Sequence, residues 1–273
     1  MARLKIAIIG CGNMGGAIAR SVVKNRVARP IDISLNDKDI RKARALSMAT
    51  GARVISGPEK ALFSDILIIS VKPQDFFELA GHIKGKLTAK TVISVMAGKS
   101  IKDIRTALVP GKGKGKFDIV RAMPNMPALI GEGMTCIAYR GKPAHIGKVR
   151  EIFESVGKLI ELDEKHLDAV TAISGSGPAY LFYLADAMVE AGRSLGLDAL
   201  TAGELVMQTL YGASTLLKLG KESPADLILK VASKKGTTEA ALSLLKEQGV
   251  KSSVVKAIRK AKKRSEELSA GRK

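Results

Sequence analysis

The 273-residue sequence predicts an α/β fold in which a doubly wound, mostly parallel sheet precedes an all-helical domain. A glycine-rich turn joins the first apolar run of the chain to a helical pattern. Short β-rich apolar runs then alternate with helical patterns through the first half. From residue 164 onward the apolar residues follow helical spacing only. These observations divide the chain into residues 1–162 and residues 163–273.

The first strand, Leu4–Ile9, runs directly into a G-C-G-N-M-G turn that begins at Gly10. Gly10 permits a tight turn, and Gly12 lets the backbone approach a phosphate without an intervening Cβ. Gly15 lets the following helix pack close to the strand, with its first N–H groups facing an anion. This order of parts predicts a Rossmann-type dinucleotide-binding domain. The alternative is an ordinary strand–turn–helix.

The remaining elements of the first domain follow in order. The expected strands are Leu4–Ile9, Ile31–Leu35, Arg53–Ile55, Ile66–Val71, Thr91–Val95, Asp118–Arg121, Met134–Tyr139 and Lys158–Glu161. The expected helices include Met14–Lys24, Lys38–Ala49, Gln74–Ile83 and Ala144–Ser155. This alternation predicts parallel strands joined by right-handed crossovers, with helices on both faces of the sheet.

The second domain is expected to be helical throughout. An apolar stripe begins at Leu167, Val170 and Ile173 and continues through Leu181 and Leu184. The later helices are expected at Leu200–Leu219, Ala225–Val231, Thr238–Gln248 and Ser252–Leu268. Because long apolar faces outnumber the neighbours available within one chain, this pattern favours a homodimer.

Composition narrows the function classes. The formal net charge of +19 attracts anionic ligands. Aromatic residues, which stack on the bases of nucleic acids, are only 4% of the chain. We therefore expect no specific nucleic-acid partner. No apolar run is long enough to span a bilayer, and we expect no signal peptide or membrane association. Two cysteines, Cys11 and Cys136, predict no disulfide framework, which suits a cytoplasmic protein. The G-K-G-K-G-K segment Gly111–Lys116 is expected to be an exposed connection.

Three further segments follow expected strands, at the edge where doubly wound sheets bind ligands: Ser70–Gln74, Val95–Gly98 and Arg121–Pro127. Each is compatible with a simple strand exit, but together they outline a crevice beside a cofactor. The segment Ser174–Tyr180 places small residues within a helical pattern. It predicts a close helix contact or a kink at Pro178, or close access for a nicotinamide or small substrate.

The segment Ser233–Glu239 places hydroxyls and lysines at the start of a helix, where N–H groups bind a carboxylate. Alternatively, Thr237 or Thr238 simply caps that helix.

The three histidines and two cysteines lack metal-ligand spacing, so no metal site is expected. No Tyr lies four residues before a Lys, the arrangement of short-chain dehydrogenases. A nicotinamide enzyme with hydroxyls and no evident strong acid suits C=N reduction, since an iminium is already protonated.

Several segments, in the same order along nearly the whole chain, resemble the pyrroline-5-carboxylate reductase family. They are Ile9–Gly15, Val71–Gln74, Arg121–Ala128, Gly131–Met134, Asp168–Tyr180, Gly236–Leu245 and Arg264–Leu268. The resemblance implies a homodimer through the helical domain, often within larger rings. It also implies hydride transfer from NAD(P)H to the C=N bond of (S)-1-pyrroline-5-carboxylate, which gives L-proline.

The resemblance further implies roles for individual residues. The cofactor residues would be Ile9, Gly10, Cys11, Gly12, Asn13, Met14, Asn36, Asp37, Lys38, Val71, Lys72, Pro73, Val95, Met96, Ala97 and Lys230. The substrate residues would be Ser233, Gly236, Thr237 and Thr238. Among these, Thr238 is the candidate catalytic residue, because it would hydrogen-bond the ring nitrogen.

Two departures from the family pattern matter. Lys234-Lys235 replaces Pro-Gly in the family's S-P-G-G-T-T loop, which loosens the loop or adds positive charge beside the carboxylate. After the second strand, Asp37 could hold a ribose 2′-OH, whereas Lys38 could pair with a 2′-phosphate. The sequence favours NADPH slightly, with NADH as the alternative. A reductase of the same architecture acting on another imine or a β-hydroxyacid, and a non-catalytic nucleotide-binding module, are the competing hypotheses.

Overall fold

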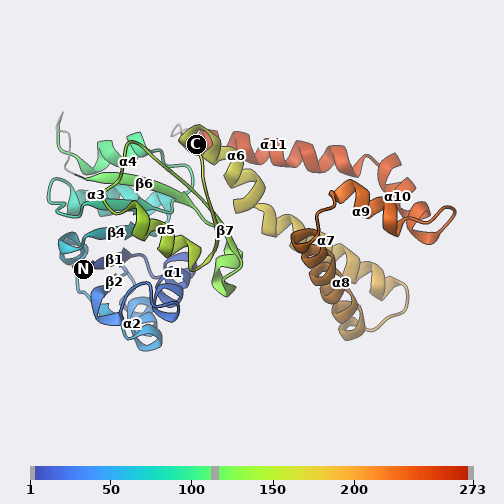
Figure 1. Ribbon diagram of the computed structural model, residues 1–273, viewed down its shortest axis with the longest axis horizontal. Coiled ribbons are helices and arrows are strands. Elements are labelled where there is room, and N and C mark those ends of the chain that lie inside the picture. The colour runs from blue at the N-terminus through green and yellow to red at the C-terminus, as the bar shows by residue number, and fades with distance from the viewer. Residues whose placement is uncertain (1–3, 112–116, 270–273) are drawn as a thin grey trace. The chain divides into compact units, whose positions relative to one another are not determined.

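The computed structural model describes residues 4–111 and 117–269 (Figure 1). The described chain forms two compact units: the first combines residues up to 176 with those from 261 onward, and the second is residues 177–260. The expected connection Gly111–Lys116 lies, apart from Gly111, outside the described residues. Within the described part, no helix is both long enough and apolar enough to cross a membrane.

The first unit is built on one eight-stranded sheet with the order β3-β2-β1-β4-β5-β6-β7-β8. The strands are β1 (Ile6–Ile9), β2 (Ile33–Asn36), β3 (Arg53–Val54), β4 (Ile66–Ile69), β5 (Thr91–Ser94), β6 (Asp118–Met123), β7 (Gly133–Tyr139) and β8 (Gly157–Glu161). All neighbouring pairs are parallel except β6–β7. This order is that of a doubly wound sheet, and the predicted fold class is confirmed.

Helices cover both faces of this sheet. They are α1 (Asn13–Lys24), α2 (Ile40–Thr50), α3 (Phe76–Ile83), α4 (Ile101–Leu108) and α5 (Ile146–Glu154). Alternate side chains of β1 enter two separate cores: Ile8 packs with α1, α2 and α5, and Ile9 packs with α3 and α4. Because both faces are buried, β1 and β4 are apolar without interruption, and each is buried along its whole length.

Prolines shift two predicted boundaries. The strand expected at Ile31–Leu35 starts at Ile33, because a 3₁₀ turn occupies Pro30–Asp32. The helix expected at Gln74–Ile83 is likewise a 3₁₀ turn, Pro73–Asp75, followed by α3. The fixed φ of proline suits the first position of such a turn, so each turn begins at its proline.

The predicted all-helical second half is confirmed from Glu164 to Ser269. A 3₁₀ turn at Glu164–His166 is followed by α6 (Leu167–Val170), a π turn (Thr171–Gly175), α7 (Gly177–Ser194), α8 (Ala199–Leu219), α9 (Pro224–Val231), α10 (Thr237–Glu247) and α11 (Val250–Ser269). The irregularity near Pro178 is therefore the preceding π turn. Pro178 itself lies in the first turn of α7, where its missing N–H leaves no bond unmade.

The last turns of α11 belong to the first unit, where a buried polar cluster holds them. Arg121 on β6 is 4% exposed and lies 3.7 Å from carboxylate oxygens of both Glu164 and Asp168. Ser265 on α11 donates a hydrogen bond of 2.7 Å to Asp168. Since a buried guanidinium needs anionic partners, the cluster holds the end of α11 against α6 and β6.

Candidate dinucleotide site

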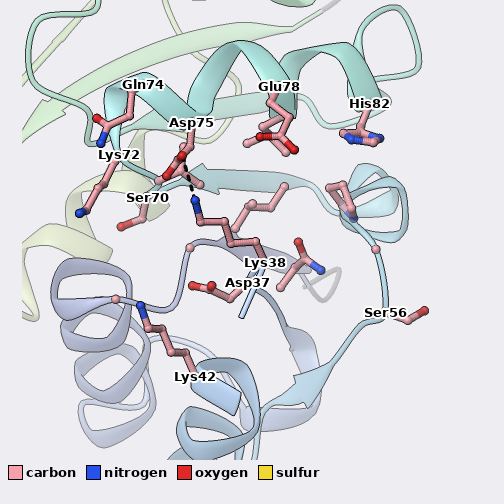
Figure 2. Close-up of a pocket in the computed structure, with 18 residues that line it drawn as sticks. Asp37, Lys38, Lys42, Ser56, Ser70, Lys72, Gln74, Asp75, Glu78 and His82 are labelled. Carbon is pink, nitrogen blue, oxygen red and sulfur yellow. Dashed lines mark hydrogen bonds and ion pairs between the residues drawn. The ribbon is translucent and has the colours of Figure 1, made fainter. Parts of the chain in front are cut away.

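A cavity of about 510 Å³ opens at the carboxyl ends of β1, β2 and β4 (Figure 2). This volume lies within the range of small-molecule and cofactor sites. The lining residues are Ile9, Gly10, Gly12, Asn36, Asp37, Lys38, Lys42, Ser56, Gly57, Pro58, Ser70, Val71, Lys72, Gln74, Asp75, Glu78, Leu79 and His82. The strand order reverses between β1 and β4, which is where open α/β sheets bind ligands.

The glycines of the first turn serve different purposes. Gly10 has φ +97°, and a Cβ there would overlap the Ser70 carbonyl oxygen. A Cβ on Gly15 would overlap the Gly10 carbonyl oxygen, so Gly15 allows α1 to approach the turn. Gly12 is extended, with φ −73°, and a Cβ on it would meet no described atom within 4 Å. The chain itself therefore leaves the space beside Gly12 open.

The start of α1 is suited to bind an anion. Gly12 is the N-cap residue, and no side chain of the described residues caps the helix there. The first N–H groups of a helix lack intrahelical partners, and the helix dipole favours negative charge at this end. An open, uncapped helix start beside a missing Cβ fits the diphosphate of a dinucleotide.

Asp37 braces the glycine turn. Its Oδ2 accepts a 2.6 Å hydrogen bond from the Cys11 N–H, and its Oδ1 accepts a 2.8 Å bond from the Asp39 N–H. Burial, and secondarily the Asp37 charge, raises the pKa of the Cys11 thiol to about 12. Cys11 thus stays protonated at neutral pH and acts as a small packed side chain.

A lysine from one side of the cavity reaches a carboxylate on the other side (Figure 2). Lys38, just after β2, reaches Asp75 in the turn after β4, with Nζ 2.9 Å from Oδ1. This hydrogen bond raises the pKa of the Lys38 ammonium, so Lys38 keeps its charge at neutral pH. Lys42 lies on α2, four residues after Lys38, and Glu78 lies on α3, three residues after Asp75. The cavity therefore presents both signs of charge to a ligand.

The cavity brings together half of the residues that the sequence predicts for the cofactor: Ile9, Gly10, Gly12, Asn36, Asp37, Lys38, Val71 and Lys72. Predicted residues beside the lining are Cys11, Asn13 and Met14 in the glycine turn and Pro73 after Lys72. Val95, Met96 and Ala97 follow the next strand, β5, and do not line the cavity.

Sequence reasoning missed several lining residues, among them Lys42, Asp75, Glu78, Leu79 and His82. The last four are spaced as one face of a helix, and Lys42 lies four residues after Lys38. Helical spacing from the strand ends is therefore the signal that could have found them. Among the residues described, no group of three or more His, Cys, Asp or Glu side chains could hold a metal ion.

The predicted substrate residues lie together at the start of α10, in the second unit. The N-cap is Gly236, and no side chain in the described part of the chain caps this helix start. The alternative interpretation that Thr237 or Thr238 caps the helix is therefore wrong. Lys235 adopts φ +59°, and its N–H donates a 2.5 Å hydrogen bond to Glu239 Oε2. The loop thus keeps a left-handed conformation at the position of the family's glycine.

The predicted cofactor residue Lys230 lies near the end of α9, also in the second unit. Its Nζ is 2.5 Å from Glu222 Oε1, and the Lys230 side chain is 66% exposed. An ion pair this exposed contributes little to stability, so it does not prevent Lys230 from contacting another anion.

Two family models match the chain. Residues 164–268 match the model described as pyrroline-5-carboxylate reductase dimerisation. Residues 5–98 match the model described as NADP oxidoreductase coenzyme F420-dependent. These segments correspond to the helical half and to the glycine turn with the first five strands.

Full-length relatives match both halves together. Pyrroline-5-carboxylate reductase of Synechocystis sp. PCC 6803 is 35% identical over 97% of this chain and 98% of its own. A solved reductase of this name from Coxiella burnetii has a TM-score of 0.87 at 29% identity, covering 98% and 99% of the two chains. The pyrroline carboxylate reductase of Plasmodium falciparum, solved with NADP bound, has a TM-score of 0.86 at 27% identity with the same coverage. The chain belongs to the pyrroline-5-carboxylate reductase family.

Proposed function

We propose that this protein reduces the C=N bond of (S)-1-pyrroline-5-carboxylate with NADPH and forms L-proline, with NADH as an alternative reductant. The observation that carries the proposal is the open glycine turn at the edge of a doubly wound sheet. It occurs in a chain whose full-length relatives are reductases of this name. A bound NADPH supplies the hydride that reduces the C=N bond.

The two units are assigned different tasks in this proposal. The turn from Ile9 to Met14 holds the diphosphate, with Asn36, Asp37 and Lys38 near the adenosine ribose. Val71–Pro73 and Val95–Ala97 are assigned to the rest of the cofactor, and Lys230 of the helical domain is assigned to it as well. The residues assigned to the substrate carboxylate and ring nitrogen are Ser233, Gly236, Thr237 and Thr238.

The absence of an evident strong acid is compatible with this chemistry. A protonated imine carries its proton before reduction, and hydride addition gives a neutral amine, so the protein need not protonate a developing alkoxide. The residues of the site then act by orienting the imine carbon. Positioning of this kind can supply a large share of a rate enhancement.

The purified protein should oxidise NADPH when pyrroline-5-carboxylate is added, and proline should appear in equal amount. The measurement is NADPH absorbance together with chromatographic detection of proline. The same assay with NADH tests the alternative reductant. Lack of turnover with either cofactor would refute the proposed reaction.

The helical unit supports a homodimer. Within residues 177–260, all of which the structure describes, the buried side chains are Ala185, Ala202 and Val206. Large apolar side chains on α7 and α8 are exposed, including Phe182, Tyr183, Leu205, Met207 and Tyr211. The few side chains buried within this unit cannot offset the conformational entropy that is lost when these helices become ordered. We therefore propose that a second copy of the chain covers the exposed apolar side chains. The matching dimerisation model supports the same partner.

Sedimentation at micromolar concentration should therefore give a particle of at least twice the 28.9 kDa chain mass. The same experiment distinguishes a dimer from a larger ring. A stable, folded monomer would contradict the proposed pairing.

The free, buried thiols of Cys11 and Cys136 suit a reducing compartment, and we place the protein in the cytoplasm.

A further inference from the structure

An ion pair spans the cavity where the adenosine ribose is proposed to bind. Lys38 belongs to the loop after β2, and Asp75 belongs to the turn before α3, 37 positions later. Their side chains are 73% and 25% exposed, so the pair is accessible to a ligand in the cavity. In Rossmann-type sites, the residues just after β2 distinguish a ribose 2′-OH from a 2′-phosphate.

The acid that commonly makes this distinction is already engaged here. Both carboxylate oxygens of Asp37 accept backbone hydrogen bonds, from Cys11 and from Asp39. Its position is therefore fixed by the glycine turn rather than by a ribose. The other charged side chains that line the cavity are the lysines Lys38, Lys42 and Lys72 and the carboxylates of Asp75 and Glu78.

We propose that Asp75 is a positioning residue that binds the Lys38 ammonium and thereby weakens selection of NADPH over NADH. The proposal rests on the dinucleotide site of the proposed function. A 2′-phosphate must compete with Asp75 for Lys38 and approach the Asp75 charge as well. NADH lacks that phosphate and leaves the pair undisturbed.

Removing the Asp75 charge should therefore tighten NADPH binding selectively. In Asp75→Asn, we expect the Kd for NADPH to fall about threefold to fivefold, since an exposed ion pair contributes at most about 1 kcal/mol. The Kd for NADH should change by less than about twofold, because NADH has no 2′-phosphate to attract or repel. Cofactor fluorescence titration of the full-length protein measures both constants without requiring turnover.

Three variants test whether the Lys38–Asp75 pair itself sets the cofactor preference. Asp75→Glu retains the charge and should restore most of the wild-type ratio of the two Kd values. Glu78→Gln removes one negative charge from the same cavity but leaves the Lys38–Asp75 pair in place, so it should give a smaller gain. In a Lys38→Gln background, Asp75→Asn should lose most of its effect, because the two residues act as a pair.

The selective gain in NADPH affinity should also diminish as salt is added, since the charged groups of the cavity are exposed to solvent. An equal gain in Glu78→Gln, or an undiminished gain without Lys38, would overturn the role given to Asp75. Wild-type protein that binds neither cofactor would instead refute the proposed dinucleotide site. An unchanged Kd ratio in Asp75→Asn, with both cofactors bound, would refute only the role of Asp75.

Discussion

Gly12→Ala is expected to weaken the affinity for NADPH strongly while leaving the protein folded. The new Cβ meets no described atom within 4 Å, and the extended backbone of Gly12 suits alanine. The same Cβ enters the space where the diphosphate is proposed to lie. Overpacking costs about 1–3 kcal/mol, which corresponds to a loss of NADPH affinity of roughly 5- to 150-fold. Titration gives the Kd, and thermal unfolding without cofactor gives the stability.

Gly147→Ala provides the matched control. Gly147 is exposed in α5, outside the cavity, and an added Cβ there also meets nothing within 4 Å. This variant should bind NADPH as the wild type does. Gly15→Ala should instead unfold or distort the domain, because its Cβ would overlap the Gly10 carbonyl. Wild-type affinity in Gly12→Ala would place the diphosphate elsewhere.

The alternation of strands and helices could be predicted from the sequence because both faces of the sheet are buried. Runs such as Ile66–Ile69 are apolar throughout, which is typical of a central parallel strand. Helix α4 was not predicted, although Ser100 and Asp103 form a capping box that marks its start. Short elements of this kind carry too few apolar positions for periodicity to detect them.

The cofactor site could be predicted only where its residues adjoin a strand end. The glycine turn and Asp37 follow strands directly, so their place at the sheet edge follows from topology. The pairing of Lys38 with Asp75 depends on two loops that meet in space, and no local pattern predicts it. Similarly, the loop motif revealed neither the left-handed backbone of Lys235 nor the hydrogen bond from its N–H to Glu239.

Thr238 is the residue whose loss should most reduce catalysis without affecting the fold. It lies in the first turn of α10 and does not cap the helix, because Gly236 is the N-cap. Its half-buried hydroxyl makes no hydrogen bond within the described chain. A hydroxyl that stabilises nothing in the free protein is available to orient the substrate's ring nitrogen.

Thr238→Ala should therefore lower kcat/KM for pyrroline-5-carboxylate by about 10- to 100-fold. This is the loss expected when a hydrogen bond to a charged group is removed. The Kd for NADPH and the melting temperature should stay near the wild-type values, because Thr238 is assigned to neither cofactor binding nor capping. Thr238→Ser retains the hydroxyl and should recover most of the activity. Loss of NADPH binding in Thr238→Ala, with kcat unchanged, would assign this threonine to the cofactor instead of the imine. A large drop in melting temperature, not rescued by serine, would show that the methyl group matters for packing, because serine keeps the hydroxyl and lacks the methyl.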